Sequence, residues 1–241
     1  MTSRSTRWLA AFGLALAASS GFAGSASAAD VRVILVGDST MATRSGYGDA
    51  LCARFTAAVD CINLAKGGRS TSSFRAEGLW DKALQLVRES AGKPAYVLIQ
   101  FGHNDQPGKP GRSTDLVKEF PINMARYARE VQEAGGTPVL VTPLTRRQFK
   151  GQWLSNDLAP WAAATRLAAG ETKAPLLDLN TDSQAAVQAM GEAEADTLAE
   201  APKPEPKFDR THLGDKGARL FSGIVADELH RAVPALNKYY N

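Results

Sequence analysis

The sequence has few of the residues that build metal sites and little excess of either charge. It contains 2 cysteines and 3 histidines in 241 residues, and two thiols without nearby histidines are too few ligands for a zinc site. The 28 basic residues nearly balance the 25 acidic ones, so the chain lacks the basic footprint that binds nucleic acid or an anionic membrane. We therefore expect a small or neutral partner, with no metal and no cofactor. The sequence does not indicate an oligomeric state.

Several signatures of known enzyme classes are also missing. The chain has no Gly-x-Ser-x-Gly motif, which disfavours the usual α/β-hydrolase with its nucleophile elbow. It has no Gly-x-Gly-x-x-Gly, no P-loop and no His-Glu-x-x-His, the motifs of dinucleotide sites, nucleotide phosphates and zinc proteases.

Long apolar runs are absent, apart from a short one near the N-terminus. Arg4 and Arg7 precede an apolar stretch over residues 8–18, and small residues follow, ending in Ala26-Ser27-Ala28. This is the layout of a secretory signal peptide, and the apolar run is well short of the roughly 20 residues of a membrane-spanning helix. We predict a signal peptide at residues 1–28, no membrane span, and a secreted or periplasmic protein.

Removal of residues 1–28 leaves residues 29–241, a length typical of one domain with a full core. An oxidising compartment would permit a disulfide between Cys52 and Cys61. Both are expected where a helix ends and a strand begins, so the sequence allows this bond without requiring it.

Short apolar runs alternate with longer amphipathic ones along the predicted domain. Strands are expected over residues 31–36, 59–64, 95–101, 137–142 and 175–179. Helices are expected over residues 46–58, 79–90, 120–134, 156–169 and 214–233. This alternation predicts a three-layer α/β/α sandwich of flavodoxin-like type with a five-stranded parallel sheet. Ligands bind such sheets at the carboxyl ends of the strands.

Residues 191–208 interrupt this pattern with acidic residues and three prolines. We interpret the segment as a solvated connector. The alternative is a mobile wall of the active site, because a candidate catalytic loop follows it directly.

A candidate nucleophile follows the first predicted strand, in Gly37-Asp38-Ser39-Thr40. A serine at a strand-to-helix turn presents its hydroxyl at the carboxyl edge of the sheet, near helical N–H groups that stabilise negative charge. Gly-Asp-Ser is also an ordinary turn, so Ser39 alone is weak support for catalysis.

A serine nucleophile needs a base, and the histidines are His103, His212 and His230. In Asp209-Arg210-Thr211-His212 one turn can bring both side chains together, so Asp209 can fix the imidazole tautomer while Nε2 takes the serine proton. The alternative is a helix cap by Asp209 beside an incidental His212. His230 lies among charged residues of the last helix, which favours a surface role.

Acyl transfer also needs donors for the developing oxyanion. Gly68, in Lys66-Gly67-Gly68-Arg69-Ser70 after the second strand, can offer its N–H, although this segment also resembles a phosphate-binding nest or a plain turn. Asn104, after the third strand, can offer its side-chain amide, although it too could belong to an ordinary turn.

Ser39, Gly68, Asn104 and Asp209-x-x-His212 occur in the order typical of the SGNH (GDSL-type) hydrolase superfamily, which the sequence resembles over nearly its whole predicted domain. The resemblance implies a flavodoxin-like fold, no metal, and a catalytic triad of Ser39, Asp209 and His212. It also implies an oxyanion hole formed by the Ser39 and Gly68 N–H groups with Asn104.

Gly37–Ala42, Gly67–Ser70 and Asp209–Leu213 look like the rhamnogalacturonan acetylesterase branch of that superfamily. The resemblance therefore implies an enzyme that removes acetyl groups from pectin-type polysaccharide. Thr142–Arg147 is similar to the same branch, so Arg146 or Arg147 could bind a galacturonate carboxylate, with surface salt bridges as the alternative. The alternative functions are a general lipid or thioester acyl hydrolase and a non-catalytic glycan-binding protein.

Overall fold

A computed structural model of the chain describes residue 1 and residues 29–90, 92–200 and 208–241. The predicted signal peptide, apart from its first residue, lies outside the described residues. No helix in the described part of the chain is long and apolar enough to cross a membrane.

A five-stranded parallel sheet forms the middle of the molecule, in the order β2-β1-β3-β4-β7. Its strands are β1 (Val31–Gly37), β2 (Val59–Asn63), β3 (Ala95–Gln100), β4 (Thr137–Val141) and β7 (Leu176–Leu177). The strands form where apolar residues run without alternation, because both faces of this sheet are covered. The predicted five-stranded parallel sheet is confirmed, although β7 is only two residues long.

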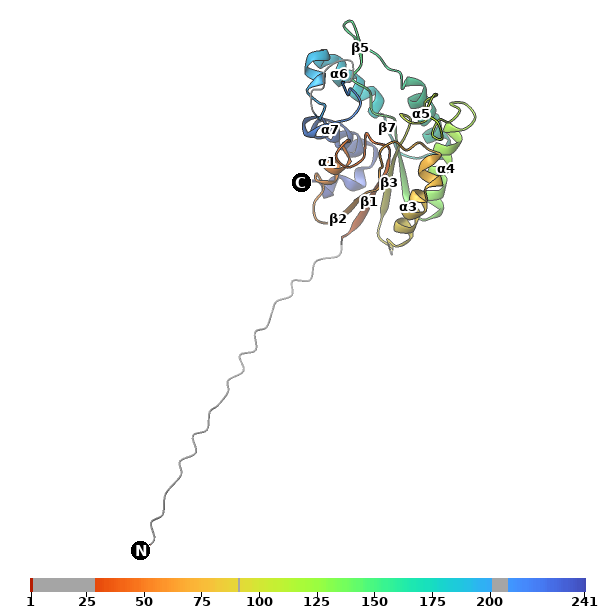
Figure 1. Cartoon of the computed structure of the whole chain (residues 1–241). Helices are drawn as coiled ribbons and strands as arrows, with labels where there is room; N and C mark the ends of the chain where they lie inside the picture. The colour runs from red at the N-terminus through yellow and green to blue at the C-terminus, as the bar shows by residue number, and fades with distance from the viewer. Residues whose placement is uncertain (2–28, 91, 201–207) are drawn as a thin grey trace.

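Helices cover both faces of the sheet and complete the three layers (Figure 1). One layer holds α1 (Gly48–Cys52), α6 (Leu179–Asp196), α7 (Asp215–Ala232) and the 3-10 helix η1 (Pro234–Tyr239). The other holds α2 (Ser73–Ala76), α3 (Leu79–Arg88), α4 (Phe120–Glu133) and α5 (Ala159–Thr172). Successive β1 side chains enter opposite cores: Val33 packs in the first and Ile34 in the second.

Two features of the first layer differ from the sequence-based expectation. The helix expected over residues 46–58 ends at Cys52, because the Thr56 N–H donates to the Tyr239 carbonyl and Phe55 bridges to Tyr240 near the C-terminus. A short antiparallel hairpin of β5 (Phe149–Lys150) and β6 (Trp153–Leu154) was also not expected.

The prediction of a solvated connector over residues 191–208 is wrong for the described part of this segment. Helix α6 runs from Leu179 to Asp196 with a break at Gly191, where φ is 74°. Ala195 and Leu198 are buried in the first core, so this segment is folded rather than solvated. Residues 201–207 lie outside the described residues.

The Cys52–Cys61 disulfide that the sequence allowed is present, with the two Cα atoms 5.5 Å apart. It joins the last residue of α1 to the middle of edge strand β2. The crosslink therefore fixes the segment that follows the Ser39 loop onto the sheet.

Candidate active site

Ser39 lies in a tight loop that begins where β1 ends. The Ser45 hydroxyl donates to the Ser39 carbonyl oxygen at 2.7 Å, and this fixes the loop across its width. A Cβ at Gly46 would lie 2.3 Å from the backbone of Thr40, so only glycine allows this close approach. The Leu213 N–H donates to the Ser45 carbonyl at 2.9 Å, which joins the Ser39 loop to the segment that carries His212.

Ser39, His212 and Asp209 form a continuous hydrogen-bonded line. Ser39 Oγ lies 2.7 Å from His212 Nε2, and His212 Nδ1 lies 2.7 Å from Asp209 Oδ2. The other histidines do not take this place: the Nδ1 of buried His103 lies 3.2 Å from a carboxylate oxygen of Asp38. Half-buried His230 stacks on an aromatic ring near the C-terminus. The structure therefore brings together the three residues expected from the sequence.

The Asp209 carboxylate is held in its ionised form. Burial raises its pKa, but hydrogen bonds from the His212 N–H, the His212 ring and the Thr211 N–H outweigh burial and lower the pKa to about 2. An ionised Asp209 keeps the Nδ1 proton of His212 in place and leaves Nε2 facing Ser39 as the proton acceptor.

The expected oxyanion donors lie on the loops beside Ser39. A Cβ at Gly67 would lie 3.7 Å from the Ser39 Cβ, so the Gly67-Gly68 loop passes close to the hydroxyl. The N–H groups of Ser39 and Gly68 donate to no other group in the described chain. Asn104 donates one amide hydrogen to the Arg69 carbonyl at 3.0 Å. Its second amide hydrogen remains for a ligand.

Arg112 sets the orientation of that amide, and nothing in the sequence pointed to it. Arg112 Nη1 donates to Asn104 Oδ1 at 3.2 Å and approaches the Gly68 carbonyl at 3.5 Å. Because a guanidinium only donates, the carbonyl side of the amide faces Arg112 and the NH₂ side faces the opposite way.

Asp105 joins the two loops that carry the oxyanion donors. Its Oδ1 accepts from the Thr71 N–H at 3.0 Å, the Thr71 hydroxyl at 2.5 Å and the Thr114 hydroxyl at 3.0 Å. Burial raises the Asp105 pKa to about 6, although these hydrogen bonds oppose the rise. Asp105 directly follows Asn104, but the sequence predicted a role only for Asn104.

A buried polar chain lies behind Ser39. Tyr47 donates to Gln100 at 2.8 Å, Gln100 to the Thr40 hydroxyl at 2.6 Å, and Thr40 to Asp38 at 2.8 Å. Burial by itself raises the pKa of Asp38. The nearby charge of His103 and hydrogen bonds from His103 and Thr40 outweigh burial, so the pKa lies below its usual value. The residues flanking Ser39 are thus fixed from inside the protein.

The structure corrects the expectation for Arg147. Its side chain is 0% exposed, so neither a substrate carboxylate nor a surface salt bridge can reach it. Arg147 Nη2 donates to the carbonyls of Asp209 at 3.0 Å and His212 at 2.7 Å, and Nη1 approaches the Thr211 carbonyl at 3.4 Å. Arg147 therefore holds the His212 loop, a role that a guanidinium can fill because it presents several donors in one plane.

Arg146 forms a salt bridge, which was the alternative to binding a substrate carboxylate. Its Nε lies 3.0 Å from Asp157 Oδ2, and its two terminal nitrogens donate to Gln106 and to the Thr211 hydroxyl. Pairing of Arg146 with a substrate carboxylate stays a prediction.

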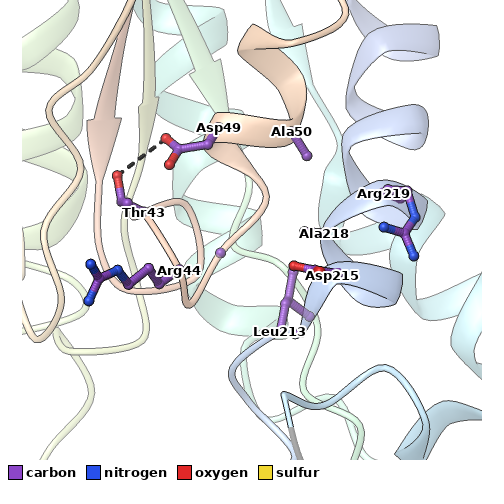
Figure 2. Close-up of a pocket in the computed structure, with 10 residues that line it drawn as sticks. Thr43, Arg44, Asp49, Ala50, Leu213, Asp215, Ala218 and Arg219 are labelled. Carbon is purple, nitrogen blue, oxygen red and sulfur yellow. Dashed lines mark hydrogen bonds between the residues drawn. The ribbon is translucent and has the colours of Figure 1, made fainter.

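A pocket of about 310 Å³ lies between the Ser39 loop and the start of α7 (Figure 2). Thr43 and Arg44 line it from the Ser39 loop, and Leu213 and Asp215 line it from the start of α7. Ser39, His212 and Asn104 do not line this pocket. It is therefore separate from the candidate ester site, although the same two loops form both.

Comparison with known proteins identifies the family. Residues 35–220 match the model of the GDSL-like lipase/acylhydrolase family. The chain belongs to this family. It is similar to rhamnogalacturonan acetylesterase RhgT of Bacillus subtilis, with 34% identity over 212 residues that cover 82% of this chain and 88% of the relative.

Solved structures agree on the fold. A Bacillus subtilis protein superposes with a TM-score of 0.71 at 24% identity, over 85% of this chain and 57% of that longer chain. The acetylxylan esterase Axe2 of Geobacillus stearothermophilus gives a TM-score of 0.62 at 17% identity, over 85% of this chain and 94% of Axe2. At these identities the likeness shows the three-layer fold alone.

Replacement of Arg147 should affect stability and activity together. Arg147→Met leaves buried carbonyls without donors, so we expect a loss of about 2–4 kcal/mol in the free energy of unfolding and a lower kcat on an acetyl ester. Arg126→Met is the matched control, because Arg126 is 62% exposed and its ion pair with Glu130 lies within its own helix; its loss should be about 0.5 kcal/mol. Equal losses from the two variants, measured by urea unfolding, would contradict the role given to Arg147.

Asp105 should make stability depend on pH. Its folded pKa of about 6 exceeds the unfolded value of about 4, so the folded state binds the proton more tightly. The contribution of Asp105 to stability therefore falls as pH rises from about 4 to 6, by roughly 2–3 kcal/mol. Asn does not titrate, so the free energy of unfolding of Asp105→Asn should rise by this amount relative to that of the wild type as the pH increases from about 4 to 8, as measured by urea unfolding. Parallel stability curves for the two proteins would show that Asp105 does not titrate in this window.

Proposed function

We propose that the protein is a serine carbohydrate esterase that removes O-acetyl groups from a polysaccharide such as rhamnogalacturonan. The observation that carries the proposal is the line from Ser39 through His212 to Asp209, beside the free N–H groups of Ser39 and Gly68. This arrangement supplies a nucleophile, a base and oxyanion donors for acyl transfer. The name of the relative RhgT supports the substrate class.

In the first half of the reaction, His212 Nε2 takes the hydroxyl proton of Ser39 as Oγ bonds to the acetyl carbonyl carbon. The oxyanion accepts from the Ser39 and Gly68 N–H groups and from the Asn104 amide. His212 then gives the proton to the sugar oxygen as the carbon–oxygen bond breaks, which leaves an acetyl group on Ser39. In the second half, His212 takes a proton from water, the water oxygen attacks the acetyl carbon, and acetate leaves as Ser39 Oγ regains the proton.

Acetate release across a panel of acetylated polysaccharides, together with nitrophenyl esters of increasing chain length, tests the proposed substrate. Activity on acetylated glycan and on acetate but not on long esters is expected. A preference for long-chain or thioester substrates would instead favour a lipid or thioester hydrolase. Binding of polysaccharide with no release of acetate would favour a glycan-binding protein.

Two substitutions separate the proposed catalytic roles. Ser39→Ala should lower kcat by about 10⁶-fold, because the base then has no nucleophile to activate. Asn104→Ala should lower kcat by about 10²–10³-fold through loss of one oxyanion donor. Asn237→Ala, at an exposed position in η1, is the matched control and should keep the wild-type rate. Wild-type turnover of an acetyl ester by Ser39→Ala would rule out Ser39 as the nucleophile.

We also propose that the protein is exported, with cleavage after Ala28. The N-terminal sequence pattern supports this, and so does the Cys52–Cys61 disulfide, since such bonds persist in oxidising compartments. Mass spectrometry of the extracellular or periplasmic fraction should find a chain that begins at Ala29. Recovery of the intact chain from the cytoplasm alone would contradict export.

A further inference from the structure

The loop over residues 106–113 leaves the Asn104 segment and returns directly to it. The Ser113 hydroxyl donates to the Gln106 carbonyl at 2.8 Å, and the Thr114 N–H donates to the Asp105 carbonyl at 3.0 Å. Inside the loop, the Arg112 N–H donates to the Lys109 carbonyl at 3.0 Å, which places these two residues on one turn. The backbone of this turn is therefore anchored next to the proposed oxyanion hole.

This turn carries two cations without an acidic partner. Arg112 contacts Asn104 and Gly68 through Nη1 only, and its Nε and Nη2 make no hydrogen bond in the described chain. Lys109 is half-buried, and its ammonium forms no ion pair with a carboxylate of the described residues. A planar guanidinium and an ammonium together offer five or more free donors to an anion.

The two cations also lie in an unfavourable electrostatic environment. Partial burial and the nearby charges of Arg146 and Arg112 lower the pKa of Lys109. The charges of Asp38 and Asp157 oppose this shift without cancelling it, and Asp157 is itself paired with Arg146. Like charges held together in this way destabilise a protein by themselves, and a bound anion removes the repulsion.

We infer that Lys109 and Arg112 bind the carboxylate of a uronic acid in the substrate, at a subsite adjoining the oxyanion hole. The inference rests on the proposed function and deepens it, because it assigns recognition of acidic glycan to a particular turn. Arg112 would use its free edge for the carboxylate while Nη1 stays on Asn104. The subsite would thereby couple binding of an acidic sugar to the orientation of the oxyanion amide.

The test uses two synthetic acetylated disaccharides that differ only at C6 of one sugar. One contains galacturonic acid, and the other contains galactose. The wild type should have a kcat/KM roughly 5-fold or more higher for the acid, mainly through a lower KM, since an exposed ion pair contributes about that factor. Added salt should reduce this preference because it screens exposed charges.

Lys109→Gln removes one charge and keeps the length of most of the side chain. It should lower the ratio of the two kcat/KM values by roughly 3- to 5-fold and weaken its salt dependence. Lys93→Gln is the matched control: Lys93 is exposed and precedes β3, at the opposite edge of the sheet, so the same change in net charge should leave the ratio unaltered. Arg112 is not suited to this comparison, because its loss would also release Asn104.

The outcomes distinguish the inference from the proposed function. Equal kcat/KM values for the two disaccharides in the wild type, or an unchanged ratio in Lys109→Gln, would overturn the carboxylate subsite while acetylesterase activity stands. Release of acetate from neither disaccharide, nor from any acetylated glycan, would overturn the proposed function and the subsite with it. A lower ratio in Lys109→Gln but not in Lys93→Gln supports the subsite.

Discussion

The candidate active site depends on one buried guanidinium. Arg147 lies in the segment after β4 and reaches the carbonyls of Asp209 and His212, so it joins that segment to a loop more than 60 residues later in the chain. Burial lowers its pKa only to about 10, so the group stays charged at neutral pH. Without this anchor, the His212 loop would be held only by bonds such as the one from Leu213 to Ser45, and catalytic geometry requires a rigidly held loop.

The other loops of the site are linked to one another in the same manner. Asp105 binds Thr71 and so connects the segments after β2 and β3, while the bond from Leu213 to Ser45 connects the Ser39 loop to the His212 loop. The loops after β1, β2 and β3 leave the same edge of the parallel sheet, which brings residues distant in sequence within reach. The site is thus assembled by hydrogen bonds between loops as well as within them, and this arrangement limits its reorganisation during acyl transfer.

The strands of the fold could be predicted because fully buried strands leave uninterrupted apolar runs, as in β1. Helix α6 could not, because few of its apolar residues are buried and its first turn contains Asn, Thr, Asp and Ser, which are typical of turns. Its helical state depends on the packing of residues such as Val187 and Ala195 against the core. The length of helix α1 was overestimated. Its local sequence is compatible with a longer helix, but contacts with the C-terminal segment end the helix early.

For the site, the sequence by itself determined the residue types and their order: Ser39, Gly68, Asn104 and the Asp209–His212 pair. These could be found because each follows a predicted strand or lies within one turn of its partner. Only the tertiary structure decided which arginine is buried, that Arg112 orients Asn104, and that Asp105 ties two loops together. Such contacts join residues far apart in sequence or set which way a side chain points, and local sequence patterns contain neither kind of information.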